Sequence, residues 1–316
     1  MVEHLKRLRT TNWITPYLFI APAIVLFLIF TVYPVIQSLW LSFQVKRGGE
    51  MMFGGLANYS RLMNDPLFWT SVKNTLIILL IQVPIMTFLA LILAVLVNAA
   101  FVRFKAFFRI SLFMPVITAL VAYSIVFKLI LDENYGLVNF LLSTVGMEKI
   151  GWLTDPTWAK VSLIMAITWR WTGYNMVIFL AGLQNIPKDL YEAASLDGAG
   201  TVRQFFSITI PQMKPVILFS VVLSTIGTLQ LFDESYILTK GGPANATLTI
   251  TQYLYQQGFK FFDFGYASAI SYVLVIMIAV LSYVQMKWAG DEELKKRQPI
   301  CFCSLLPLSH SPRFTG

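Results

Sequence analysis

The sequence EAASLDGAGTVRQFFSITIP, residues 192–211, lies between two strongly apolar segments of the chain. Its first residues favour a helix, and Gly198 and Gly200 are expected to interrupt that helix because glycine readily adopts other backbone conformations. Residues Val202 to Phe206 then resume a helical pattern. We expect a short two-part surface helix that presents small side chains.

The residues just before this stretch predict where its helix begins. Pro187 can begin a turn, and Asp189 is a residue type that favours the N-cap position. Glu192 would then lie in the first turn, where the helix dipole stabilises a carboxylate. Taken alone, the segment could also be an ordinary amphipathic helix at the membrane interface.

Apolar residues occur in long blocks along the chain. Of its 316 residues, 57% are hydrophobic and only 13% are charged, whereas soluble domains carry about 25% charged residues. A membrane-spanning helix needs about 20 apolar residues. The sequence therefore predicts an all-α polytopic membrane protein with six transmembrane helices. These are predicted at 16–42, 71–99, 107–131, 160–183, 212–235 and 266–288.

Lysine and arginine are distributed unevenly between the connections. Connection 100–109 holds three basic residues and no acid, and basic residues also mark both chain ends and 184–211. Because cytoplasmic loops are enriched in Lys and Arg, these segments are predicted to be cytoplasmic, with both termini inside. The net charge of +8 is explained by this topology, so no nucleic-acid partner is expected. The long connections 43–70, 132–159 and 236–265 are expected to form short interfacial helices and turns on the outer side.

Several kinds of chemistry are excluded by what the chain contains. Its only histidines are His4 and His310, and its only cysteines are Cys301 and Cys303, all near the ends. A histidine-based metal site, a catalytic triad or a disulfide within the membrane body is therefore excluded. The phosphate-binding pattern GxxxxGK[ST] does not occur. We expect no cofactor, no metal site and no enzymatic activity in this chain.

The spacing in residues 192–211 resembles the EAA loop of ABC importer permeases. That loop reads EAA, three residues, G, nine residues and I-x-L-P, and only Ile210 departs from it, where the family has Leu. Three further stretches, YLFIAPAIVLFLIFTVYPVIQSLWLSF, GLANYSRLMNDPLFWTSVKNTL and LFDESYILTKGGP, resemble the carbohydrate-uptake branch of these permeases and, within it, the maltose-permease F type. The similarity covers about residues 16–289.

This resemblance implies a type I importer permease in the plasma (inner) membrane of a prokaryote. Its partners would be two ATP-binding subunits, a second homologous permease and an extracytoplasmic solute-binding protein, so ATP would be bound by partners. The chain divides into a cytoplasmic N-terminus (1–15), a first transmembrane helix with its outer loop (16–70), a permease core (71–289) and a cytoplasmic tail expected to be disordered (290–316). Within the core, loop 189–211 would couple to the ATPase. The coupling residues implied are Glu192, Ala193, Ala194, Asp197 and Gly198.

The fourth predicted span contains a polar and aromatic octet, TWRWTGYN, at residues 168–175. An arginine about ten residues into a span is costly unless it has a function or a partner. Aromatic faces and amide or guanidinium groups are the groups that bind sugars, although these residues could also simply pack between helices. By the resemblance, Tyr174 matches a sugar-contacting tyrosine, and Thr228 and Gln230 fall in the other polar stretch lining the cavity, although the family's asparagines are not reproduced there. The predicted substrate pathway is Arg170, Trp171, Tyr174, Asn175 and Gln230.

Different cargoes and different classes of protein remain open at this point. The expected cargo is an oligosaccharide or glycoside. The alternative is a sugar phosphate such as a glycerol phosphate, whose anionic group Arg170 would bind. An ion-coupled secondary transporter is disfavoured because the spans lack inverted repeats and coupling carboxylates. A purely structural membrane scaffold would leave the polarity of residues 168–175 unexplained.

Overall fold

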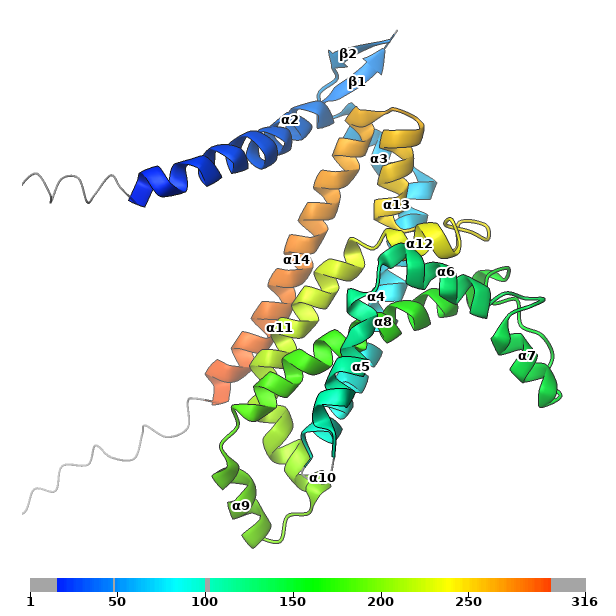
Figure 1. The fold of residues 1–316 in the computed structure, drawn as a ribbon. Helices are drawn as coiled ribbons and strands as arrows, with labels where there is room; N and C mark the ends of the chain where they lie inside the picture. The colour runs from blue at the N-terminus through cyan, green and yellow to red at the C-terminus, as the bar shows by residue number, and fades with distance from the viewer. Residues whose placement is uncertain (1–15, 48, 100–102, 297–316) are drawn as a thin grey trace, which may run out of the picture.

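The computed structural model describes residues 16–47, 49–99 and 103–296. The predicted N-terminal segment 1–15 and residues 297–316 of the predicted tail lie outside this range, as do both histidines and both cysteines. Long helices run between two ends of the molecule, with α9 (Lys188–Leu196) at one end and α3 (Ala57–Met63) toward the other (Figure 1). Each of the six predicted spans overlaps helical structure, although the third and fifth differ from the expected form. Among the described residues, four helices, or five if one bent pair counts as a span, are long and apolar enough to cross a membrane.

Two helices of similar length, α4 (Pro66–Asn98) and α8 (Pro156–Gln184), pack along each other in the middle of the molecule. Both begin at an Asp-Pro pair. The Asp65 carboxylate accepts a hydrogen bond from the Leu67 backbone N–H at 2.9 Å, and that of Asp155 accepts one from the Thr157 N–H at 2.9 Å. Proline suits the first helical position because its missing N–H would have no intrahelical partner there. These caps place the helix starts four or five residues before the predicted positions.

The third predicted span, 107–131, is not one straight helix. It consists of α5 (Lys105–Ile117) and α6 (Leu120–Ile130), which meet at an angle of 97°. Pro115 lies inside α5, where its ring and missing N–H weaken the last turns. Thr118 and Ala119 then adopt extended backbone angles that end the helix. The expectation of a continuous span was therefore wrong.

A close backbone contact joins α5 to α8. A Cβ atom added to Gly173 would lie only 1.7 Å from the Leu112 carbonyl oxygen. Small residues at such crossings let helix backbones approach within van der Waals distance in membranes. Gly173 therefore fixes where the bent pair crosses the central helix.

The fifth predicted span, 212–235, also differs. A single helical run, Thr201–Leu229, contains α10 (Thr201–Gln204), the π-helical turn η2 (Phe205–Thr209) and α11 (Ile210–Leu229). The second half of the predicted two-part surface helix is therefore continuous with a span. At the other end the helix stops at Leu229, and Asp233 and Glu234 belong to the separate short helix α12 (Asp233–Leu238) instead of the span.

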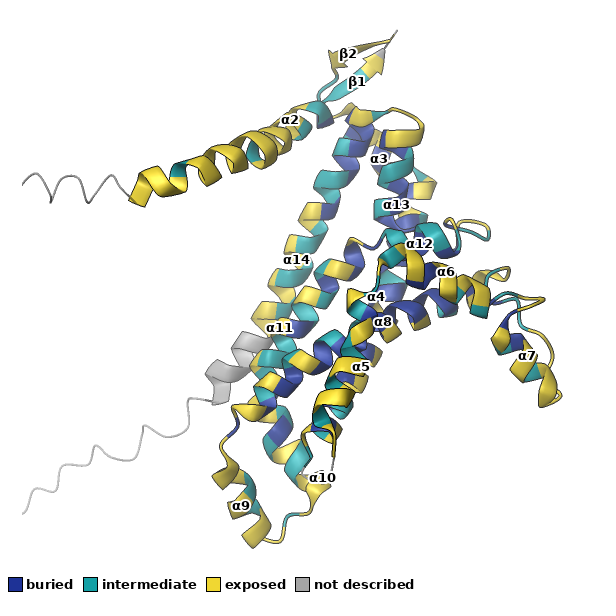
Figure 2. Cartoon of the chain, in the orientation of Figure 1, coloured by how far each residue is buried: buried dark blue, intermediate teal, exposed yellow. Residues whose placement is uncertain are grey.

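The last helix, α14 (Phe264–Lys296), packs beside α11 and continues past the predicted end at residue 288. The first helix, Pro16–Ser42, includes the π-helical turn η1 (Leu28–Val32) and α2 (Tyr33–Ser42), and it contacts the rest of the chain mainly where α2 meets α14. None of its most apolar window is buried. Figure 2 shows this helix extending away from the other helices with almost every residue exposed.

The connections at the end opposite α9 form short elements, as expected from the sequence, and one is a β-hairpin that an all-α prediction did not include. In the hairpin, Gln44 pairs with Phe53 and Arg47 with Glu50. The strands of the hairpin are β1 (Gln44–Arg47) and β2 (Glu50–Phe53). The connections also contain α7 (Leu137–Thr144), α13 (Ile250–Tyr255) and the π-helical turn η3 (Gln256–Lys260).

A polar cluster holds these connections onto the helix ends. The Asp65 carboxylate accepts hydrogen bonds from the hydroxyls of Tyr253 and Tyr266, the latter at 2.5 Å. Arg61 stacks 3.9 Å from the centroid of the Tyr266 ring and pairs with Asp263 at 2.7 Å. Burial opposes ionisation of Asp65, but these hydroxyls and the backbone N–H groups hold its pKa below the usual value. The start of α4 is thereby tied to α13 and α14.

Candidate functional site

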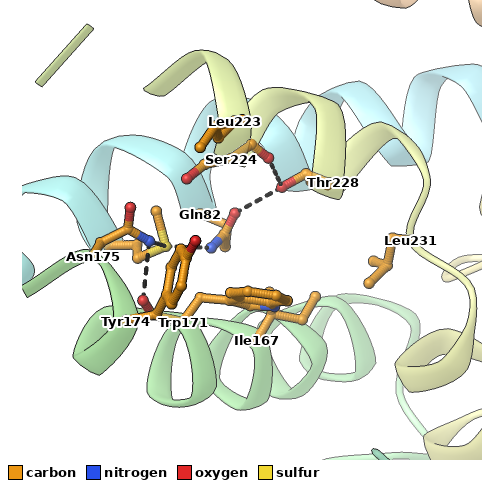
Figure 3. Close-up of a pocket in the computed structure, with 11 residues that line it drawn as sticks. Gln82, Ile167, Trp171, Tyr174, Asn175, Leu223, Ser224, Thr228 and Leu231 are labelled. Atoms are coloured by element: carbon orange, nitrogen blue, oxygen red, sulfur yellow. Dashed lines mark hydrogen bonds between the residues drawn. The ribbon is translucent and has the colours of Figure 1, made fainter. Parts of the chain in front are cut away.

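A cavity of about 220 Å³ lies where α4, α8 and α11 meet. Figure 3 shows the side chains of Trp171, Tyr174 and Asn175 from α8 facing Gln82 of α4 and the polar side of α11. The spacing of 3.6 residues per turn puts positions i, i+3 and i+4 of α8 on one face, which is why these three side chains meet here. The lining consists of Gln82, Met86, Ile167, Trp171, Tyr174, Asn175, Leu223, Ser224, Gly227, Thr228 and Leu231.

Two aromatic rings line the cavity. Trp171 and Tyr174 meet edge to face, with ring centroids 5.7 Å apart and planes at 86°. Such perpendicular pairs are favoured by the charge distribution of aromatic rings. The cavity therefore presents aromatic surface in two orientations.

Amides and hydroxyls form the polar side of the cavity. Thr228 Oγ1 donates to Gln82 Oε1 at 3.0 Å, and Ser220 donates to the Asn175 side-chain oxygen. The Gln82 amide nitrogen donates only to the sulfur of Met86, at 3.3 Å, and thioether sulfur is a weak acceptor. Gln82 and Asn175 are thus held in place by neighbours, while the Gln82 N–H groups have no strong acceptor among the described residues.

None of the residues lining the cavity carries a charge. Arg170, predicted for the substrate pathway, is buried but points elsewhere. It donates to the Val116 carbonyl at 3.2 Å, and its guanidinium lies 4.8 Å from the Tyr123 ring centroid and 5.7 Å from that of Trp171. Arg170 therefore stabilises a free carbonyl at the end of α5, where the helix dipole favours a cation. Its guanidinium also lies near the Trp171 ring.

The structure brings together three of the five predicted pathway residues, Trp171, Tyr174 and Asn175. Gln230 is exposed at the C-cap of α11 and does not line the cavity, whereas Thr228, from the same predicted polar stretch, does. Gln82 and Ser224 line the cavity but were not predicted from the sequence, and neither was Ser220, which bonds to Asn175. Gln82 is an uncharged polar residue inside an apolar span, and that signal alone could have identified it.

A second candidate site is the loop at the other end of α11. Helix α9 begins at Lys188 with Pro187 at its N-cap and without a side-chain cap. Asp189 thus lies in the first turn instead of capping, and Glu192 lies in the second turn, which corrects both expectations. The predicted break after this helix is present, because Gly198 adopts a φ of +75°, a left-handed conformation that favours glycine.

Helix α9 is attached to the base of the long helix by side chains. Gln204 Nε2 donates to Ser195 Oγ and to the Ala199 carbonyl, both at 2.9 Å. The hydroxyls of Tyr191 and Thr209 form a hydrogen bond of 2.9 Å. Because three contacts tie the two parts of the loop together, α9 and the start of the Thr201–Leu229 helix form one unit.

Most side chains of this unit are exposed, including large apolar ones. No residue of α9 is buried, and Leu196, Val202 and Phe206 are 90%, 72% and 62% exposed. Of the predicted coupling residues, Glu192, Ala193, Asp197 and Gly198 are exposed, and Ala194 is half-buried. Ala194 and Asp197 line a hollow of about 230 Å³ between α9 and α10. Exposed apolar residues grouped in this way are typical of a protein-protein contact.

The chain is similar to known transport proteins over nearly all of its length. The lactose transport system permease protein LacF of Rhizobium radiobacter is 51% identical over 88% of this chain and 94% of its own length. The trehalose/maltose transport system permease protein MalF of Thermococcus litoralis is 34% identical over 86% of this chain and 92% of its own. A crystal structure of a bacterial ABC transporter for import of the acidic polysaccharide alginate has the same fold, with a TM-score of 0.77 at 24% identity, covering 93% of this chain and 99% of that chain.

These similarities confirm the resemblance seen in the EAA loop and the importer permease fold expected from it. A family model described as the binding-protein-dependent transport system inner membrane component matches residues 51–287. This range includes α4 to α11, the cavity and the α9 loop. The chain belongs to the family of binding-protein-dependent transport system inner membrane components, the permease subunits of ABC importers.

Proposed function

We propose that this chain is the membrane-spanning subunit of an ATP-driven importer that moves a neutral oligosaccharide or glycoside through the cavity between α4, α8 and α11. The observation that carries the proposal is the single helix Thr201–Leu229. It begins in the unit that contains α9 and ends with Leu223, Ser224, Gly227 and Thr228 in the cavity wall. At 1.5 Å per residue, this helix of 29 residues is about 43 Å long. It can therefore transmit a displacement from α9 to the cavity.

The force on this helix comes from separate ATP-binding subunits that dock against α9. The exposed apolar side chains of the unit supply their contact, and the side-chain bonds of Tyr191 and Gln204 pass the motion to the helix. When the ATP-binding subunits close, they turn α9 and the attached helix, and the cavity changes the side on which it opens. The chain itself supplies no catalytic group for ATP hydrolysis.

The chemistry of the cavity supports a neutral sugar. The faces of Trp171 and Tyr174 match the C–H surface of a sugar ring, and the N–H groups of Gln82 can donate to a hydroxyl. The permeases named for lactose and for trehalose and maltose support the same class of cargo. A sugar phosphate has no such support, because Arg170 points to α5 and no cation lines the cavity.

Further subunits complete the transporter. The first helix buries none of its most apolar window within the chain, so we assign its surface to lipid and to a second permease subunit. A solute-binding protein, as the family description implies, delivers the sugar, and we assign its contact to the end opposite α9. Two ATP-binding subunits would then serve two permeases.

The cavity is tested by removing its rings. Tyr174→Ala and Trp171→Ala are each expected to reduce sugar uptake strongly in proteoliposomes containing the whole complex. Tyr174→Phe should do less harm, because one hydrogen bond contributes about 1 kcal/mol while loss of a ring removes a whole contact surface. ATP hydrolysis stimulated by the binding protein is measured in parallel. If Tyr174→Ala leaves both uptake and sugar selectivity unchanged, these rings only pack between helices.

The orientation of the chain follows from the proposal. Residues 103–109 and the α9 unit are placed in the cytoplasm, because Lys and Arg are enriched there. In a chain without Cys301 and Cys303, we expect Phe104→Cys and Thr201→Cys to react with an impermeant thiol reagent only from the cytoplasmic side. Asn245→Cys should react only from the other side. Labelling of Thr201→Cys from outside the cell would exclude contact between α9 and cytoplasmic ATPases.

A further inference from the structure

Four aromatic rings that follow the end of α11 and lie in or directly beside α12, α13 and η3 contact one another. They belong to Phe232, Tyr236, Tyr255 and Phe259, here called the aromatic ladder. The Tyr255 ring centroid lies 5.0 Å from that of Phe232, 5.5 Å from that of Tyr236 and 5.4 Å from that of Phe259. Tyr255 is therefore the central ring of the ladder, in contact with each of the other three.

The ladder begins one residue after the last residue that lines the cavity. Leu231 lines the cavity, and Phe232 is the next residue in the chain. Two hydrogen bonds hold α13 against this point, from Thr249 Oγ1 to the Leu231 carbonyl at 2.7 Å and from Thr251 Oγ1 to the Leu229 carbonyl at 3.4 Å. Because α13 carries Tyr255, these bonds fix the position of the central ring relative to the cavity-lining residue Leu231.

The rings overlap only partly, so their faces are not fully covered by one another. Phe232 and Tyr236 are nearly parallel, at 16°, with centroids 5.3 Å apart. Parallel rings in contact are separated by about 3.5 Å, so a centroid distance of this size means a sideways offset of about 4 Å. The exposure of the rings also increases along the ladder, from the half-buried Phe232, Tyr236 and Tyr255 to Phe259, which is 61% exposed.

Polar groups accompany the rings. Lys260 Nζ lies 5.7 Å from the centroid of Tyr236, and Asp233 and Gln256 are half-buried next to ladder residues in the chain. Aromatic faces beside hydroxyl-binding groups are the combination already found in the cavity. A belt of aromatic side chains at a membrane interface needs only outward-facing rings, whereas these rings contact one another, and the first of them follows the cavity-lining Leu231 in the chain.

We propose that the aromatic ladder is an outer binding subsite for the saccharide, which guides successive sugar rings from the binding protein to the cavity. This proposal rests on the proposed function, because it assumes that the cavity carries a sugar. The partial overlap of the rings suits a chain of two or more sugar units, since each offset face offers a platform to one unit. The central ring, Tyr255, contributes most because it bridges the two stacked pairs.

The experiment uses the complete transporter in proteoliposomes, with lactose as the probe and sugar-loaded binding protein supplied outside. Tyr255→Leu and Phe259→Leu remove a ring, and Tyr255→Phe keeps it. Phe88→Leu is the matched control, because Phe88 is also 61% exposed but lies on α4 outside the ladder. The initial rate of uptake at limiting substrate, ATP hydrolysis stimulated by the binding protein and the amount of assembled complex are measured for each variant.

Both ring-removing variants are expected to lower uptake about three- to tenfold, the factor that corresponds to aromatic contact energies, with normal assembly and normal ATP hydrolysis. Tyr255→Phe and Phe88→Leu should remain near wild type. Wild-type uptake in both ring-removing variants would overturn the proposal and leave an interfacial belt. A parallel fall in uptake and ATP hydrolysis, or failed assembly of both, would also overturn it, because the rings would then hold a partner subunit. Absence of lactose uptake by the wild-type complex would instead count against the proposed cargo.

Discussion

Replacing Gly173 with alanine is expected to prevent assembly of the permease. A Cβ atom at this position would overlap the Leu112 carbonyl oxygen at 1.7 Å, and the atom that must move belongs to the backbone of α5. Overpacking a closely packed site typically costs about 1–3 kcal/mol and more when the backbone has to move. We therefore expect little folded subunit in detergent extracts, measured by size-exclusion chromatography of the purified complex.

Gly227→Ala is the matched control for this prediction. Gly227 lies on α11, and nothing is within 4 Å of the position of an added Cβ. The same substitution should therefore leave assembly intact, although it should reduce uptake because Gly227 lines the cavity. If Gly173→Ala assembles as well as Gly227→Ala, α5 and α8 do not cross in the way described.

The second large effect is expected at the α9 unit. Glu192→Arg should abolish sugar uptake while leaving membrane insertion and assembly intact, because Glu192 is exposed on the proposed contact surface with the ATP-binding subunits. Gly198→Val should have the same effect by a different cause. Its φ of +75° is strongly disfavoured for a β-branched residue, so the angle between α9 and the long helix must change.

The measurement for both variants is ATP-dependent uptake together with retention of the ATP-binding subunits during purification. Glu148→Arg is the control, since it makes the same change of charge at another exposed position outside the α9 unit. Normal uptake by Glu192→Arg and Gly198→Val, with the ATP-binding subunits still bound, would remove the assignment of α9 as the coupling element.

Sequence patterns predicted helical structure at each expected span but not its exact bounds or form. Apolar length locates a helix in a membrane, yet it cannot show a bend such as that at Thr118 and Ala119, because apolar residues continue on both sides of it. Pro115 was the sequence signal for this break. The starts of α4 and α8 were predictable in principle, since Asp65-Pro66 and Asp155-Pro156 combine an N-cap with a favoured first residue. Both starts were placed too late because hydropathy alone set the boundaries.

The candidate site was predicted in part for a similar reason. Residues on one helix, such as Trp171, Tyr174 and Asn175, share a face that helical spacing reveals. Which face turns to the cavity depends on packing, so Arg170 on the adjacent stripe reaches Val116 instead. The contribution of Gln82 comes from a helix far away in the chain, and only the fold brings it next to Thr228.

The most direct test of the account is sugar uptake by the reconstituted wild-type complex under controlled energy supply. Proteoliposomes containing this chain, its partner permease and the ATP-binding subunits are given a radiolabelled oligosaccharide with the binding protein outside, and either ATP inside or a proton or sodium gradient without ATP. We expect uptake only when both ATP and the binding protein are present. Uptake driven by an ion gradient in the absence of ATP would contradict the account, because α9 and the helix attached to it would then have no role in transport.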